Sequence, residues 1–116
     1  MIIGIGVDVV DLARFERAIH RTPRLRERLF AESERQLPLA SLAARFAAKE
    51  ALIKAFGGAA GARWCDLVVE CDEHGRPSFA LYGAAREAAR SRGIARLHVS
   101  MTHDAGVACA FVVAES

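Results

Sequence analysis

The sequence has no apolar run approaching the roughly 18 residues that a membrane-spanning helix needs. The apolar stretch at residues 1–10 has no basic flank and contains Asp8, so we do not expect a signal peptide. Paired cysteines are also lacking, because Cys65, Cys71 and Cys109 show no spacing typical of a disulfide scaffold or a metal site. Unpaired thiols are typical of a reducing compartment. We therefore expect a cytoplasmic protein with no membrane segment.

Familiar nucleotide-binding loops are absent as well. No Walker-type sequence occurs, and Gly4-Ile5-Gly6 lacks the third glycine and the following helix of a dinucleotide-binding loop. No charge dominates either, since 16 Lys and Arg face 14 Asp and Glu, for a net charge of +2. Duplex binding is typical of a larger positive charge, and single-strand binding of aromatic residues interleaved with basic ones. We therefore do not expect a nucleic-acid partner.

The length of 116 residues suits one domain, which we expect to cover residues 1–116. A chain of this size buries only roughly 60–70% of its unfolded surface, so its core is modest. Hydrophobic residues nevertheless make up 53% of the sequence. This surplus predicts that another subunit covers part of the apolar surface.

Periodicity and turn residues predict an α+β fold with a largely antiparallel sheet and a long buried central helix. Strands are expected at 1–10, 66–72, 77–81, 95–102 and 107–114, and helices at 12–21, between Pro23 and Phe30, at 39–56 and at 83–92. A tight turn is expected at 103–106. In the first strand Asp8 shares a face with Gly4 and Gly6, which predicts open space beside its carboxylate.

The expected helix at 39–56 is apolar on nearly every side, yet four charged residues interrupt it. Lys49 projects from its stripe of large apolar side chains, with Arg45 and Glu50 on the two flanks, and Lys54 lies one turn beyond Glu50. Buried charge is unfavourable unless it is paired or bound. The residues are therefore either a structural ion-pair network or part of a charged pocket.

Asp8 and Glu50 are the candidate metal ligands. Two carboxylates, one from a strand and one from a buried helix, can converge on one hard cation, and oxygen ligands favour Mg²⁺ or Ca²⁺ over Zn²⁺. The alternative is structural: Asp8 would cap a turn, and Glu50 would pair with Lys49 or Lys54. The spacing of the residues does not decide between the two.

Arg45, Lys49, Lys54 and His103 are candidate phosphate ligands around such a metal. Lys54 could equally be a solvated surface residue, and His103 a turn residue bonded to Asp104. Ser100, His103 and Asp104 do not suit a catalytic triad, because triad residues come from distant parts of a fold. Three arginines on the first helix, Arg14, Arg17 and Arg21, form either a solvated face or a docking surface for an acidic partner.

Taken together, the motifs resemble holo-acyl-carrier-protein synthases, the small bacterial phosphopantetheinyl transferases. The resemblance runs in order along nearly the whole chain, and the Asp8 block and the Lys49-Glu50 block together make it specific. Its motifs are Gly4-Ile5-Gly6-Val7-Asp8-Val9-Val10-Asp11, Arg28-Leu29-Phe30 with Glu34, Arg45-Phe46-Ala47-Ala48-Lys49-Glu50-Ala51, Lys54-Ala55-Phe56-Gly57, Trp64 with Asp66, Gly75-Arg76-Pro77 and Val99-Ser100-Met101-Thr102-His103-Asp104.

The resemblance implies a reaction in which 4′-phosphopantetheine moves from coenzyme A to a serine of apo-acyl carrier protein, with release of adenosine 3′,5′-bisphosphate. By similarity, Asp8 and Glu50 would hold Mg²⁺ against the diphosphate, and Lys54 would contact the diphosphate and protonate or neutralise the leaving phosphate. Either metal-bound water, or Glu50 through water, would accept the proton of the serine. Such a role places the protein in fatty acid biosynthesis.

The remaining expected contacts also follow from the resemblance. Arg45 would meet the 3′-phosphate region of coenzyme A, His103 would contact phosphate, and Gly75 and Pro77 would border the adenine. The arginines of the first helix would engage the acidic helix of the carrier protein. The family is typically a homotrimer with active sites between subunits, which would set Asp8 and Glu50 against His103 or Gly75 of a neighbour.

One departure from the family and two alternative functions accompany this hypothesis. The segment between Glu34 and Arg45 is shorter than in many such enzymes, so no contacts are transferred from it. One alternative is a metal-dependent phosphohydrolase that uses Asp8 and Glu50 on a nucleotide and needs no protein acceptor. The other is a non-catalytic module that binds coenzyme A or a carrier protein and tolerates loss of Glu50.

Overall fold

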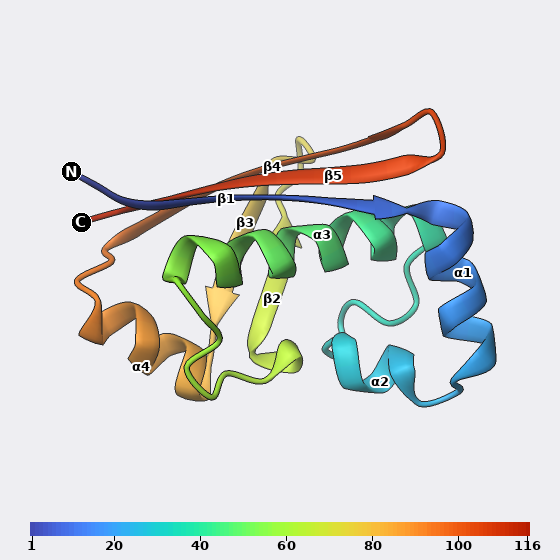
Figure 1. Ribbon diagram of the computed structural model, residues 1–116, viewed down its shortest axis with the longest axis horizontal. Helices are drawn as coiled ribbons and strands as arrows, with labels where there is room; N and C mark the ends of the chain where they lie inside the picture. Colours follow the sequence, from blue (N-terminus) through green and yellow to red (C-terminus); the bar gives the residue numbers. More distant parts are fainter.

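The computed structural model describes residues 1–116, in which two antiparallel sheets lie around one long helix (Figure 1). The larger sheet has the strand order β1-β5-β4, and the smaller one pairs β2 with β3. Their bounds are Ile2–Asp11 for β1, Leu67–Cys71 for β2, Pro77–Leu81 for β3, Arg96–Asp104 for β4 and Val107–Glu115 for β5. The α+β class and the antiparallel pairing expected from the sequence are confirmed, with the strands divided between two sheets.

Helix α3 (Leu39–Phe56) runs antiparallel to β1 beneath the larger sheet, and the remaining elements cover its other side (Figure 1). It is covered on both sides, which explains why the helix is apolar nearly all round and not on one face alone. Ten of its residues are buried, including Lys49. The helix ends where Gly57 adopts a left-handed conformation with φ of 82°. The long buried central helix is therefore confirmed, with the expected bounds.

The space that the sequence predicted beside Asp8 is occupied by the backbone of α3. A Cβ atom on Gly4 would overlap the carbonyl oxygen of Ala55, and one on Gly6 would overlap that of Ala51. The two glycines thus let strand and helix approach more closely than any side chain would allow. The expectation of open space was wrong, since the glycines serve this close contact instead.

The short helices pack at the two ends of α3. Helix α1 (Leu12–Arg21) begins at Asp11, whose Oδ1 accepts a hydrogen bond of 2.9 Å from the Arg14 amide, and α2 (Leu25–Leu29) follows it. Phe15 of α1 stacks on Phe46 of α3 with ring centroids 5.7 Å apart. A 3₁₀ turn at Trp64–Asp66 precedes β2, and α4 (Gly83–Ser91) precedes β4.

The turn between β4 and β5 is shorter than expected. Only Ala105 and Gly106 lie outside the strands, both with positive φ, and the pairing continues to Asp104 opposite Val107. Two left-handed residues match the twist of an antiparallel hairpin, so the strands remain paired up to the turn. His103 is therefore a strand residue rather than a turn residue. No helix in residues 1–116 is long and apolar enough to cross a membrane.

Candidate active site

Asp8 and Lys54 form an ion pair between the edge strand β1 and the last turn of α3. The Lys54 Nζ lies 3.2 Å from Asp8 Oδ1 and donates a second hydrogen bond of 2.9 Å to the carbonyl oxygen of Val7. The Lys54 side chain is 54% exposed, whereas that of Asp8 is 19% exposed. The Asp8 carboxylate is thus only partly buried, and it is paired with a lysine that solvent reaches.

Glu50 lies one turn before Lys54 on α3 and shares the electrostatic environment of Asp8. Burial raises the pKa of the Glu50 carboxyl, and the negative charge of Asp8 raises that pKa further, while Lys54 acts in the opposite direction. Lys54 forms its hydrogen bond with Asp8, so Glu50 has no cation bonded to it. The cluster therefore places two carboxylates beside one lysine.

This donor set fits Mg²⁺. Two carboxylates with one neighbouring cation leave a negative local charge, and Mg²⁺ is commonly bound by one or two carboxylates together with waters and substrate phosphates. No group of three or more His, Cys, Asp or Glu side chains in residues 1–116 is placed to hold a metal. A closed structural metal site made by protein ligands alone is therefore absent from this chain.

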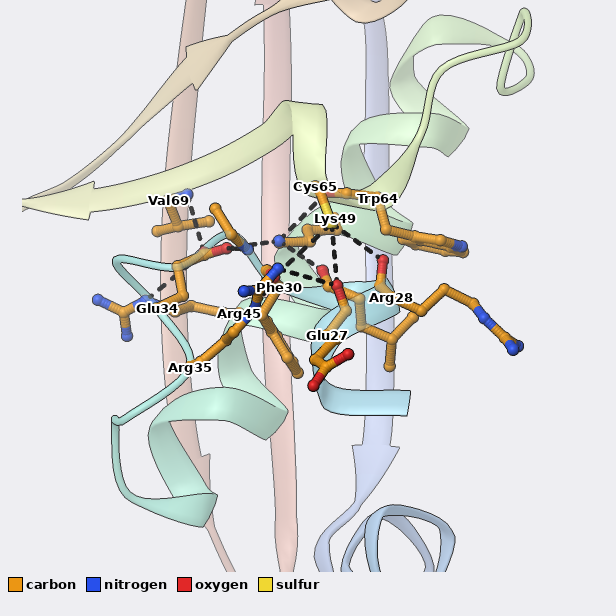
Figure 2. A network of polar contacts seen from close by, with 12 residues as sticks. Glu27, Arg28, Phe30, Glu34, Arg35, Arg45, Lys49, Trp64, Cys65 and Val69 are labelled. Atoms are coloured by element: carbon orange, nitrogen blue, oxygen red, sulfur yellow. Dashed lines mark hydrogen bonds and ion pairs between the residues drawn. The ribbon is translucent and has the colours of Figure 1, made fainter. Parts of the chain in front are cut away.

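Lys49 projects from a different side of α3 than Glu50 and Lys54 and is completely buried. Its Nζ donates hydrogen bonds to Leu29 O at 2.7 Å, Glu34 Oε1 at 2.7 Å and Trp64 O at 3.2 Å, and it lies 4.9 Å from the centroid of the Phe30 ring (Figure 2). Burial lowers the pKa of Lys49, and the hydrogen bond and charge of Glu34 oppose that shift.

All three donors of the Lys49 ammonium group are thus used by the protein, which leaves none for a phosphate. The structure corrects the expectation that Lys49 is a phosphate ligand. Its surroundings instead match the structural ion-pair network that the sequence left open.

Glu34 is the partner that makes this burial of Lys49 possible, and sequence reasoning assigned it no role. It is 1% exposed, and Oε1 accepts hydrogen bonds from Lys49 Nζ and from the amide of Ala31, while Oε2 accepts one from the amide of Val69. Glu34 therefore joins the loop after α2, strand β2 and α3 at one point (Figure 2). Its place in the family motif Arg28-Leu29-Phe30 with Glu34 was the available signal.

Arg45 lines an open groove of about 820 Å³ between the loop after α2 and strand β2. Its Nη2 lies 3.4 Å from Cys71 Sγ, and its Nε lies 4.0 Å from Glu34 Oε2. This Nε is the one buried side-chain nitrogen or oxygen without a hydrogen-bond partner. Arg45 is the only basic residue lining the groove, together with the acidic Glu32, Asp66 and Glu70.

The other predicted site residues lie apart from Asp8 within one chain. Gly75 has φ of 78° in the exposed β2–β3 turn, and Pro77 begins β3. His103 is exposed near the end of β4, opposite Ala108 of β5, on the side of the sheet that faces α3. No hydrogen bond or ion pair joins any of the three to Asp8 or Glu50.

The arginine stripe lies on α1, at the edge of the Asp8 region. Arg14, Arg17 and Arg21 are all exposed, and none forms an ion pair within the chain. Arg14 and Asp8 line one groove of about 460 Å³, with Phe15 and Phe46 among its apolar walls. The stripe is therefore available to a partner that reaches Asp8.

The arrangement has a family counterpart. Residues 4–112 match the family model of the 4'-phosphopantetheinyl transferase superfamily. The chain belongs to this superfamily. The holo-[acyl-carrier-protein] synthase of Leifsonia xyli subsp. xyli is 64% identical over 115 residues, which are 99% of this chain and 98% of the relative.

Solved structures of the superfamily share the fold of this chain. Holo-[acyl-carrier-protein] synthase from Neisseria meningitidis has a TM-score of 0.90 and 34% identity, with full coverage of both chains. The Helicobacter pylori enzyme, solved in complex with coenzyme A, has a TM-score of 0.84 and 32% identity and covers 96% of this chain and 99% of its own. The family and fold predicted from the sequence are both confirmed.

Proposed function

We propose that this superfamily member transfers 4′-phosphopantetheine from coenzyme A to a serine of apo-acyl carrier protein and releases adenosine 3′,5′-bisphosphate. The observation that carries the proposal is the placing of Asp8, Glu50 and Lys54 together across β1 and α3, in a chain 64% identical to a relative with this named activity. The three free cysteines further support a cytoplasmic location.

Each side chain has a role that suits its position. Asp8 and Glu50 would hold Mg²⁺, which when bound neutralises the negative charge on the diphosphate of coenzyme A. The serine hydroxyl would lose its proton to water, its oxygen would form the new bond to the phosphorus that bears pantetheine, and the bond from that phosphorus to the bridging oxygen would break. Lys54 stabilises the charge that develops on the leaving phosphate.

The contacts to the rest of coenzyme A belong to the same proposal. Arg45 would bind the 3′-phosphate region through its guanidinium, whose Nε forms no hydrogen bond within the protein. His103 would contact phosphate, and Gly75 and Pro77 would border the adenine. Because these residues lie apart from Asp8 within one chain, the proposal requires that neighbouring subunits complete the site.

Incubation of an apo-acyl carrier protein with this enzyme, coenzyme A and Mg²⁺ tests the function. We expect intact-protein mass spectrometry to show a gain of one phosphopantetheine, and EDTA to abolish the gain. Nucleotide release without a gain on the carrier would instead indicate a phosphohydrolase. Binding of coenzyme A with neither product would indicate a non-catalytic module.

Substitution Glu50→Gln tests the metal assignment within this reaction. The amide keeps the size of the side chain but loses the negative charge, so we expect transfer to fall by at least about 100-fold while the circular dichroism spectrum stays unchanged. Single-turnover rates at saturating coenzyme A measure the loss. Full activity in Glu50→Gln would exclude Glu50 as a metal ligand.

Arg14, Arg17 and Arg21 would dock the acidic surface of the carrier protein. We expect Arg14→Ala to raise the KM for the carrier several-fold and to weaken coenzyme A binding much less, because the side chain is exposed on α1. The effect should shrink as salt is added. Arg90→Ala, on the exposed side of α4, serves as control. Equal effects on carrier and coenzyme A would contradict docking by α1.

We also propose that the enzyme is a homotrimer. The outer side of β1 exposes Ile3, Ile5, Val7 and Val9, and Val7 lies opposite Phe111 of β5, which is itself 45% exposed. Contiguous apolar surface of this kind marks an interface. We expect multi-angle light scattering to give a trimer mass for the native chain and a smaller mass for Val7→Asp. An active monomer would contradict shared sites.

A further inference from the structure

Lysine is scarce in this chain. Of the 16 Lys and Arg residues only two are lysine, and both lie on α3, each held by a different carboxylate. Lys49 is enclosed by three acceptors and has no exposed surface. Lys54 is the opposite case, because its side chain is more than half exposed and bonded only at its tip. The two ammonium groups therefore differ sharply in their freedom to move.

The ammonium group of Lys54 occupies the space beside Asp8 that a bound metal ion would need. Its Nζ lies 3.2 Å from Asp8 Oδ1, one of the oxygens that would coordinate a cation. Its second acceptor, Val7 O, belongs to β1, which is an edge strand of its sheet. Lys54 thus covers part of the open edge of β1 and one face of the Asp8 carboxylate at the same time.

We propose that Lys54 is an internal counterion that holds Asp8 in the metal-free protein and leaves Asp8 for the donor diphosphate when a divalent cation binds. The inference rests on the proposed function, because it takes Asp8 and Glu50 as the metal ligands. A divalent cation and an ammonium group on the same carboxylate oxygen repel each other strongly. The exposed, flexible lysine is the partner that can move.

This exchange gives Lys54 two negatively charged partners in succession. In the free protein it offsets the repulsion between Asp8 and Glu50, which keeps the carboxylates in place before the metal arrives. After the exchange its ammonium group is available to the diphosphate of coenzyme A, which carries the same kind of oxygen acceptors. Metal binding and donor binding are therefore coupled through one side chain.

The scarcity of lysine allows the exchange to be observed directly. Protein labelled with ¹³Cε,¹⁵Nζ-lysine gives one ε-methylene signal for Lys49 and one for Lys54, and Lys54→Arg assigns them. Titration with Mg²⁺ alone should move the Lys54 signal towards its position in metal-free Asp8→Asn, where its partner has lost the negative charge. The Lys49 signal should stay in place as an internal reference. Coenzyme A added afterwards should shift the Lys54 signal again.

Calorimetry with Mg²⁺ supplies the second readout. Lys54→Met removes the competing cation, so we expect its dissociation constant for Mg²⁺ to be about two- to fivefold lower than that of the native chain, as the modest strength of exposed ion pairs implies. Lys54→Arg keeps the charge and should bind Mg²⁺ as the native chain does. Equal or weaker binding by Lys54→Met would overturn the proposal.

The two readouts separate failure of this inference from failure of the proposed function. A Lys54 signal that stays still while calorimetry records Mg²⁺ binding would overturn the exchange and leave the transferase activity standing. Absence of Mg²⁺ binding, both to the native chain and to Lys54→Met, would overturn the exchange together with the metal assignment. Neither experiment requires the carrier protein or a completed reaction.

Discussion

Replacing Gly6 by alanine is expected to destabilise the protein by at least about 4 kcal/mol, which is most of the stability of many small domains. The added methyl group would overlap the carbonyl oxygen of Ala51 in α3. Both atoms belong to, or are fixed to, regular backbone, so no side-chain rotation relieves the overlap. The strand and the helix must therefore separate, which disturbs the buried contacts between them. Urea unfolding followed by circular dichroism measures the loss.

Gly93→Ala is the matched control for this substitution. Gly93 has φ of 70° and nothing within 4 Å of an added Cβ, so the alanine meets only the backbone cost of a left-handed residue, about 1–2 kcal/mol. The difference between the two variants isolates the overlap with α3. If Gly6→Ala lost no more stability than Gly93→Ala, that result would contradict the close contact between the backbones of β1 and α3.

Removing the buried ammonium group by Lys49→Met should cost about 3–5 kcal/mol, because it leaves the Glu34 carboxylate buried without its counterion. Methionine fills a similar volume, so little of this loss is due to a cavity. Two carbonyl oxygens, those of Leu29 and Trp64, also lose their donor. Thermal and urea unfolding at one protein concentration measure the loss.

Two further variants test whether the charge is the cause. Addition of Glu34→Gln to Lys49→Met removes the unpaired carboxylate but keeps an oxygen for the amides of Ala31 or Val69, and should recover on the order of 1–2 kcal/mol. Lys54→Met removes the other lysine of α3 from an exposed pair and should cost at most about 1 kcal/mol. Similar losses for Lys49→Met and Lys54→Met would contradict the buried network.

Much of the fold was predictable because its elements carry local signals. Residues close together in the sequence predict three of these features. They are the apolar alternation of β1, Asp11 as the N-cap of α1, and Gly57 at the end of α3. The length of the β4–β5 turn was predicted wrongly because Ala105 adopts the left-handed conformation. Alanine rarely does so, and the neighbouring residues give no sign of it.

The site was only partly predictable, because its contacts join residues far apart in the sequence. Helical periodicity places Lys49 and Lys54 on different sides of α3, but it does not say which side meets a carboxylate from elsewhere. That depends on where Glu34 and Asp8 lie in three dimensions. For the same reason, the glycines of β1 suggested a cavity when they in fact receive a helix.

The pairing of β1 only with β5 also shapes how the chain is made. During translation at about 5–20 residues per second, the 95 residues between β1 and β5 (residues 12–106) take roughly 5–19 s to add. Until then β1, with its row of isoleucine and valine side chains, has no partner strand. The nascent polypeptide is thus open to misassembly at β1 until β5 has been made.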